Sequence, residues 1–264
     1  MDLEKICSQV RELAENTGDF IRSQKDKITV DVVDIKGVHN FVTYVDTESE
    51  KKIVSGLINI LPDAGFIAEE GTSTKKGSVY NWVIDPLDGT TNFIHGISPF
   101  AVSIALMEHD KVVLGVVFEV MLRECFYAWE GSAAYLNGKE IRVSERKKVS
   151  DSLIATGFPY YAYDRLQSFL KTLSHFMINS HGVRRLGSAA TDLAYVACGR
   201  FEGFYEYSLS PWDVAAGVII VQQAGGKVCD FSGNDNYIFG KEIIASNPDI
   251  HSEFLDVIKN IMTE

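Results

Sequence analysis

The amino-acid sequence predicts a mixed α/β fold that is rich in antiparallel strands in its first half. Short apolar runs, such as residues 101–107 and 112–117, follow one another closely with only a few polar residues between them. From about residue 147, apolar runs of strand length alternate with segments whose apolar residues recur every three or four positions. Strands that alternate with helices are typical of α/β layering. A chain of 264 residues is long enough for one large domain or two closely joined smaller ones.

The individual elements follow from the same periodicities. A first amphipathic helix is predicted over residues 3–17, and a second from about residue 46 to residue 61, where Pro62 ends it. The dipeptide Asn137-Gly138 predicts a tight hairpin between strands 134–136 and 141–143. The other expected elements are strands 66–68, 82–84, 101–107, 112–117, 124–129, 153–156 and 203–206, and helices 165–178, 189–198 and 214–224.

The charged segment from residue 144 to residue 152 is the predicted boundary between two halves. We expect an N-terminal half, residues 1–146, with an antiparallel sheet and most of the acidic site residues. A C-terminal α/β half, residues 147–264, would contribute Asp213 and the residues that contact substrate.

The net charge excludes some classes of partner. The chain has 25 basic and 36 acidic side chains, a formal charge of −11, within an ordinary globular composition. Such a field disfavours nucleic acids and anionic membranes as general partners, and it would repel a phosphorylated substrate unless cations intervene.

Cysteine usage and hydropathy predict a soluble cytoplasmic protein. The four cysteines are far apart in the sequence and form no CxxC pair, as expected of reduced thiols. Residues 1–10 lack the apolar region of a signal peptide, and no run of about 18 apolar residues predicts a membrane span.

Three acidic clusters stand at the ends of predicted elements. Glu69 and Glu70 follow strand 66–68, Asp85 and Asp88 follow strand 82–84, and Asp213 opens helix 214–224. A single pair of strand-end acids is usually no more than solvated surface. Here three clusters lie at the ends of rigid strands and helices, so we expect them to come together in one site.

The segment from Asp85 to Asn92 combines ligands for a cation with donors for an anion. Two carboxylates and a backbone carbonyl, with no His or Cys nearby, favour Mg²⁺ or Mn²⁺ over Zn²⁺. Gly89-Thr90-Thr91-Asn92 offers backbone amides that could hold phosphate oxygens if a short helix begins there. Metal-assisted phosphoryl transfer requires both kinds of group side by side.

Charge counting supports a metal site. Two carboxylates about 4 Å apart repel by roughly 4 kcal/mol at an effective dielectric constant near 20. Two Mg²⁺ ions would balance the charge of −4 on Glu69, Asp85, Asp88 and Asp213. A third ion, or Lys36, would help to offset an incoming phosphate.

Three segments resemble the signatures of the inositol monophosphatase family, within the lithium-sensitive, magnesium-dependent phosphatase superfamily. They are residues 68–70 (AEE), 85–91 (DPLDGTT) and 212–217 (WDVAAG). The resemblance implies a layered αβαβα sandwich of the inositol monophosphatase and fructose bisphosphatase type. It also implies hydrolysis of inositol monophosphate or a similar small polyol phosphate with two or three Mg²⁺, inhibition by Li⁺, and a homodimer.

The same resemblance implies roles for individual residues. Glu69, Asp85 and the Leu87 carbonyl would hold a first ion, and Asp85, Asp88 and Asp213 a second, with a weaker third ion near Glu69. Thr90, with Asp46 as its partner, would activate a water molecule for direct in-line attack without a phosphoenzyme.

Substrate contacts follow from the likeness as well. The Gly89 and Thr90 amides would bind phosphate. Glu206 and Asp88 would accept hydrogen bonds from the polyol, beside a loop formed by Gly187, Ser188 and Ala189. Lys36 is one residue closer to Asp46 than is usual in the family, which leaves its role open.

Other functions share this metal core. A 3′(2′),5′-bisphosphate nucleotidase that acts on adenosine bisphosphate, a fructose-1,6-bisphosphatase and a histidinol phosphatase are the enzymatic alternatives, and a regulatory binding protein is the non-enzymatic one. Arg184 and Arg185 could bind a second phosphate, although surface pairing or a dimer contact is the favoured interpretation of the pair. His95 is interpreted as a loop or interface residue rather than a substrate contact.

Overall fold

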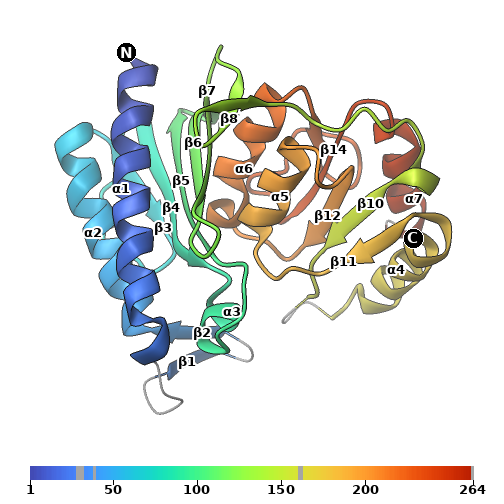
Figure 1. Cartoon of the computed structure of the whole chain (residues 1–264), viewed down its shortest axis with the longest axis horizontal. Helices are drawn as coiled ribbons and strands as arrows, with labels where there is room; N and C mark the ends of the chain where they lie inside the picture. The colour runs from blue at the N-terminus through green and yellow to red at the C-terminus, as the bar shows by residue number, and fades with distance from the viewer. Residues whose placement is uncertain (28–32, 38–39, 160–162, 263–264) are drawn as a thin grey trace.

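The structure, a computed structural model, describes residues 1–27, 33–37, 40–159 and 163–262 and has five layers (Figure 1). Two helices cover the outer face of a seven-stranded sheet, two more lie between that sheet and a five-stranded sheet, and another pair covers the far face of the second sheet. This arrangement confirms the predicted αβαβα sandwich. The helices, in layer order, are α1 (Leu3–Gln24) and α2 (Tyr44–Ile60), α5 (Ala189–Ala197) and α6 (Pro211–Gln223), and α4 (Leu166–Asn179) and α7 (His251–Met262).

The seven-stranded sheet has its strands in sequence order, and all neighbours are antiparallel except β3 and β4, which are parallel. The predicted hairpin is confirmed, with φ of 49° at Asn137 and 83° at Gly138. Its second strand is Lys139–Ile141 rather than the predicted 141–143, because Lys139, directly after the two-residue turn, already pairs with Leu136. The strands are β3 (Gly65–Ala68), β4 (Tyr80–Asp88), β5 (Ala101–Glu108), β6 (Lys111–Glu119), β7 (Glu124–Trp129), β8 (Ala134–Leu136) and β9 (Lys139–Ile141).

Strand β4 corrects the prediction that Asp85 and Asp88 follow a strand, because it continues through both residues. Asp85 pairs with Ser103 and Asp88 with Ala101, so β4 has one residue more than β5 in this interval. In a regular strand, residues three apart point to opposite faces. Because β4 has this extra residue, the carboxylates of Asp85 and Asp88 lie on the same face of the sheet.

The five-stranded sheet is mixed, in the order β11-β10-β12-β14-β13. Strand β10 is parallel to β11 and β12, whereas β14 is antiparallel to β12 and β13. The strands are β10 (Leu153–Thr156), β11 (Gly182–Arg184), β12 (Gly203–Tyr207), β13 (Lys227–Cys229) and β14 (Glu242–Ser246). Smaller elements are η1 (Lys25–Lys27), the hairpin β1 (Val33–Gly37) and β2 (Asn40–Thr43), α3 (Thr90–Ile94) and η3 (Val149–Asp151).

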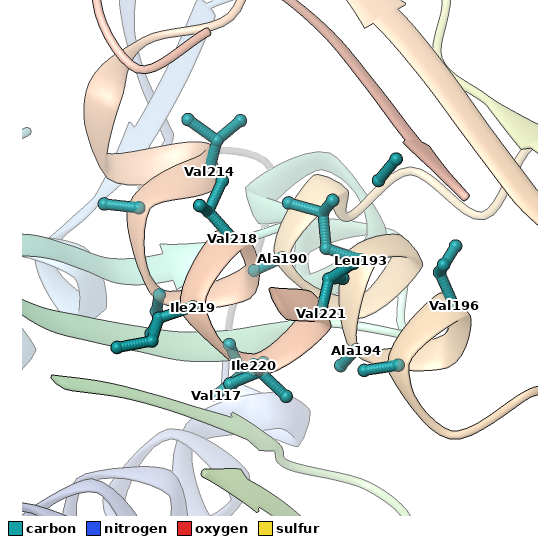
Figure 2. Close-up of a cluster of buried hydrophobic side chains, with 14 of the residues drawn as sticks. Val117, Ala190, Leu193, Ala194, Val196, Val214, Val218, Ile219, Ile220 and Val221 are labelled. Atoms are coloured by element: carbon teal, nitrogen blue, oxygen red, sulfur yellow. The ribbon is translucent and has the colours of Figure 1, made fainter. Parts of the chain in front are cut away.

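Helix α6 is the centre of the molecule. Residues 214–221 are all buried, as expected of a helix that is apolar on every side. Figure 2 shows Val218 and Ile220 of α6 with Leu193 of α5 and Val117 of β6 in one apolar cluster. The first sheet lies within residues 65–141 and the second within residues 153–246, and this cluster includes residues from both. The packing therefore holds the N-terminal end of α6, with Asp213, in a defined place relative to both sheets.

Candidate active site

Strand pairing brings the first acidic residues together. Strands β3 and β4 are parallel, and Ala68 lies opposite Ile84. Glu69, which follows Ala68, therefore lies beside Asp85, which follows Ile84. The Glu69 amide donates to the Ile84 carbonyl at 3.2 Å. Glu69 and Asp85 thus emerge side by side at the same end of the sheet.

The third acidic cluster joins through β5 and α6. The Ser103 hydroxyl, opposite Asp85 on β5, donates to the Trp212 carbonyl at 3.1 Å. The next residue, Asp213, accepts the Ser210 amide at 2.7 Å in the first turn of α6. These contacts direct the start of α6 toward the end of the first sheet.

One carboxylate oxygen from each of Asp85, Asp88 and Asp213 lies within 4.8 Å of the other two. Glu69 and the Leu87 backbone line the same pocket. At 4.8 Å each ionised pair repels by roughly 3 kcal/mol at an effective dielectric constant near 20. A set of buried or half-buried, hard oxygen donors with this much mutual repulsion could hold a divalent metal ion, and it fits Mg²⁺ or Mn²⁺ better than softer metals.

The electrostatics of the four acids agree with this reading. Burial, followed by the charges of Asp213, Glu70 and Asp46, raises the pKa of Glu69 to about 8. Burial is also the main cause that raises the pKa of Asp88 to about 6. For Asp85 and Asp213, burial and neighbouring carboxylates raise the pKa well above its ordinary value. A bound cation would favour the ionised forms of all four.

Thr90 lies between an acidic side chain and the carbonyl of the predicted metal ligand Leu87. Its hydroxyl oxygen is 3.0 Å from Asp46 Oδ1 and 3.0 Å from the Leu87 carbonyl oxygen. Asp46 is itself held by Thr43, whose amide and hydroxyl donate to Oδ2 at 2.8 and 2.6 Å. Burial raises the Asp46 pKa to about 6. A hydroxyl has one proton, so Thr90 donates to one acceptor at a time and can also accept a hydrogen bond.

A short helix, α3, does begin after Asp88, as phosphate binding by the backbone amides would require. Gly89 precedes it with φ of 94°, and a Cβ there would lie 3.1 Å from the Pro99 carbonyl oxygen and 3.2 Å from that of Gly187. Both the backbone conformation and the space therefore require glycine. The Asn92 amide donates to the carbonyls of Pro99 and Leu186 at 2.7 and 2.8 Å, which ties α3 to the loop of Gly187.

The N-terminus of α5 forms another part of the pocket wall. Asp88 Oδ2 accepts the Ser188 hydroxyl at 2.6 Å and the Ala190 amide at 2.7 Å. The predicted substrate loop and the predicted metal ligand are thus in direct contact.

Glu206 lies on β12 in the same pocket and is 8% exposed. A Cβ on Gly157 would lie 1.9 Å from the Glu206 carboxyl carbon, so Gly157 makes room for this side chain. Burial raises the pKa of Glu206 to about 8, while the charge of Arg185 acts in the opposite direction.

The structure therefore gathers nearly all the predicted site residues around one pocket. Asp46 lies behind Thr90 rather than in the lining, and it is 1% exposed. Lys36 belongs to β1, and its predicted role stays a prediction. The lining includes Glu69, Asp85, Leu87, Asp88, Gly89, Thr90, Gly187, Ser188, Ala189, Glu206 and Asp213.

Comparison with known proteins decides the family, because a model of the inositol monophosphatase family matches residues 2–263. The chain belongs to the inositol monophosphatase family. It is 40% identical over 251 residues to the Nus factor SuhB of Pseudomonas aeruginosa, across 93% of each chain. It is 40% identical over 228 residues to the inositol-1-monophosphatase of Mesorhizobium japonicum, across 86% of each. A Thermotoga maritima protein named fructose-1,6-bisphosphatase/inositol-1-monophosphatase is 41% identical over 237 residues, across 89% of each.

Solved structures support the same family. The extragenic suppressor protein suhB of Bartonella henselae superimposes with a TM-score of 0.89 at 38% identity, covering 96% of this chain and 97% of that one. The Thermotoga maritima inositol monophosphatase gives a TM-score of 0.87 at 37% identity, with 96% of both chains covered. Within the described part of this family member, no helix has the length and apolar character needed to cross a lipid bilayer.

Two further residues of this inositol monophosphatase family member lie outside the predicted set of ligands: Arg185 is predicted chiefly as a surface or dimer contact, with a second phosphate as the alternative, and Asp192 has no predicted role. Arg185 lines the pocket, whereas its neighbour Arg184 is exposed, as is His95. Asp192 of α5 is completely buried, and neither of its carboxylate oxygens has a hydrogen-bond partner. Burial, with the charges of Glu206 and Asp88, raises its pKa well above the ordinary value. No sequence pattern marks Asp192, because the charges that surround it belong to Glu206 and Asp88, which come from other segments of the chain.

Proposed function

We propose that this chain is a magnesium-dependent phosphomonoesterase that hydrolyses inositol monophosphate or a similar small polyol phosphate. The observation that carries the proposal is the convergence of Asp85, Asp88 and Asp213 within 4.8 Å, beside Glu69 and the hydrogen-bonded pair Thr90 and Asp46. Membership of the inositol monophosphatase family supports a phosphatase.

The residues fit two Mg²⁺ ions that share Asp85. Glu69, Asp85 and the Leu87 carbonyl would hold one, and Asp85, Asp88 and Asp213 the other, with a third ion near Glu69. When bound, Mg²⁺ supplies a Lewis acid that lowers the pKa of coordinated water and neutralises phosphate charge.

Thr90 and Asp46 would handle the proton of the attacking water. The Thr90 hydroxyl donates its proton to Asp46 and can accept a hydrogen bond from water with a free lone pair. Asp46 is kept in place by two donors from Thr43, so its orientation is set before substrate binds. The amides of Gly89 and Thr90, at the start of α3, would bind phosphate oxygens while water attacks in line.

Two carboxylates of the pocket suit hydroxyl groups of a substrate. Glu206 and Asp88 both line the pocket with carboxylates, and the Ser188 hydroxyl orients Asp88. A carboxylate accepts hydrogen bonds from hydroxyls and repels a second phosphate. This chemistry supports a polyol as the alcohol component of the ester.

The test is release of inorganic phosphate from a panel of substrates, with Mg²⁺ or with EDTA. Inositol 1-phosphate should be hydrolysed at the highest kcat/KM, and EDTA should abolish the activity. Faster turnover of adenosine 3′,5′-bisphosphate or histidinol phosphate than of inositol phosphate would show that the polyol assignment is wrong. Full activity in EDTA would refute the metal assignment.

Fructose 1,6-bisphosphate is the second candidate substrate, and Arg185 is the observation that favours it. Arg185 is a basic residue in the pocket lining, and guanidinium groups bind phosphate well. The Thermotoga maritima relative is named for both activities. If this candidate is correct, Arg185→Met should lower kcat/KM for the bisphosphate far more than for inositol phosphate. Equal effects on both substrates would exclude it.

A regulatory role as a binding protein is the non-enzymatic alternative, since the Pseudomonas aeruginosa relative is named a Nus factor. The complete carboxylate set favours an enzyme, because buried acids that only repel one another would be costly to retain. We further propose a cytoplasmic homodimer that does not bind nucleic acid directly. Sedimentation of the purified chain, alone and with RNA, tests both statements.

A further inference from the structure

Glu50 is a buried acidic residue outside the predicted site. It lies on α2, has no exposed surface, and accepts two backbone amides from a distant loop. Oε2 accepts the Glu70 amide at 2.7 Å, and Oε1 accepts the Thr72 amide at 2.6 Å. We propose that Glu50 is a positioning residue that holds the loop after β3, and so keeps Glu69 in place to bind metal. This inference rests on the proposed metal-dependent function.

The loop is exposed to solvent where it bonds to Glu50. Gly71 and Thr72 are exposed, and no atom lies within 4 Å of the place where a Cβ on Gly71 would be. On the β3 side, the Glu69 amide is bonded to the Ile84 carbonyl. The next residue, Glu70, donates the first of the two hydrogen bonds to Glu50. The backbone of Glu69 is therefore held from both sides, by the sheet and by α2.

The strength of this attachment follows from its chemistry. Hydrogen bonds from amides to a carboxylate are shorter and stronger than those between neutral groups. Here both oxygens of one carboxylate are used, which fixes the orientation of the carboxyl plane as well as its position. The helix that carries Glu50 is itself anchored by Ile53, Val54 and Leu57, which are buried in the core between α1, α2 and the first sheet.

The same helix also carries Asp46. Residues four apart lie on one face of a helix, so Asp46 and Glu50 point in a common direction, and both are buried. Asp46 contacts Thr90 and Glu50 contacts the loop of Glu69. Helix α2 thus aligns the proposed water-activating pair with a proposed metal ligand, although it contributes no metal ligand itself.

The decisive perturbation is Glu50→Gln. The side chain keeps its size, but one oxygen becomes an NH₂ group that faces an amide donor, so one of the two hydrogen bonds is lost. Outer partners of metal ligands typically contribute 10–100-fold to metal affinity. We expect the Kd for metal to rise by roughly 10–100-fold, with activity recovering at high Mg²⁺.

Glu48→Gln is the matched control. Glu48 is on the same helix, exposed, and paired with Lys51 at 2.7 Å. The substitution is chemically identical, and it should leave metal affinity unchanged. A second variant, Thr72→Pro, removes one donor from the exposed loop without altering the core, and it should also weaken metal binding.

Metal binding is measured by titrating the full chain with Mn²⁺ and following the electron paramagnetic resonance signal of the free ion. Amide hydrogen exchange at Glu70 and Thr72 provides a second measurement that needs neither metal nor activity, and protection of at least one of the two amides should fall in Glu50→Gln but not in Glu48→Gln. If the wild-type chain binds Mn²⁺ and both Glu50→Gln and Thr72→Pro bind it equally well, the positioning role is refuted. If the wild-type chain binds no Mn²⁺, the proposed function fails and this inference with it. Should Glu50→Gln not fold, Thr72→Pro alone decides between these outcomes.

Discussion

Replacing Asp88 by Asn tests whether the acidic cluster binds metal. The substitution separates the electrostatic repulsion that destabilises the fold from the contribution of Asp88 to metal binding. Asp88 Oδ2 accepts hydrogen bonds from Ser188 and Ala190, and an Asn side-chain oxygen can accept the same two. The substitution preserves volume and these contacts. It removes one negative charge that lies within 4.8 Å of Asp85 and Asp213.

The magnitude follows from the pKa of Asp88. The rise from 3.8 to about 6 corresponds to about 3 kcal/mol of destabilisation when the group is ionised, at 1.36 kcal/mol for each pKa unit. Without metal at pH 7.5, Asp88→Asn should therefore raise the free energy of unfolding by up to about 3 kcal/mol, or roughly 6–12 °C in Tm. With Mg²⁺ the wild type should be more stable than the variant, because the variant has lost a ligand that is proposed to bind the metal. Phosphate release should fall by more than about 100-fold.

The assay is thermal unfolding of the wild type, Asp88→Asn and the exposed control Asp110→Asn, in EDTA and in Mg²⁺, together with phosphate release. Asp110 lies in the turn between β5 and β6, so its substitution should change neither quantity. The reasoning would be refuted if Asp88→Asn kept near-normal activity, or if it were less stable than the wild type in EDTA while still gaining the full stabilisation from Mg²⁺.

Four further outcomes are expected. Thr90→Val should lower kcat by roughly 10²–10⁴-fold without changing the Mn²⁺ affinity, whereas Thr90→Ser should keep most of the activity; unchanged turnover in the Val variant would remove Thr90 from the proton path. Glu206→Gln should raise KM for inositol phosphate about tenfold but leave hydrolysis of p-nitrophenyl phosphate unchanged, and parallel losses on both would point to misfolding. In EDTA, urea unfolding should show stability falling as the pH rises from 5 to 9, since Asp88 and Glu69, with pKa values of about 6 and 8, hold protons that the unfolded chain has already lost. Saturating Mg²⁺ should abolish that slope. Li⁺ should inhibit the hydrolysis, with a potency that changes when Mg²⁺ is varied; no inhibition up to high concentration would contradict the family-based expectation.

Local signals predicted much of this fold. Strand 124–129, the hairpin turn at Asn137-Gly138 and the buried helix that follows Asp213 all depend on periodicity or turn chemistry within a short window. The short strands β11, β13 and β14 were not predicted. A strand of three to five residues has too few alternations to establish a period, and its pairing depends on partners far along the chain.

The sequence by itself determined which acids are candidates, because their positions beside apolar runs and glycines are visible in one dimension. Only the tertiary structure decided that β4 continues through Asp85 and Asp88 with an extra residue that turns both carboxylates to one face. It also decided that Arg185 lines the pocket and that Glu50 holds the loop of Glu69. The physical reason is the same in each case. A carboxylate or guanidinium acquires its role from the donors, charges and burial around it, and these come from segments that lie 20 to 100 residues away.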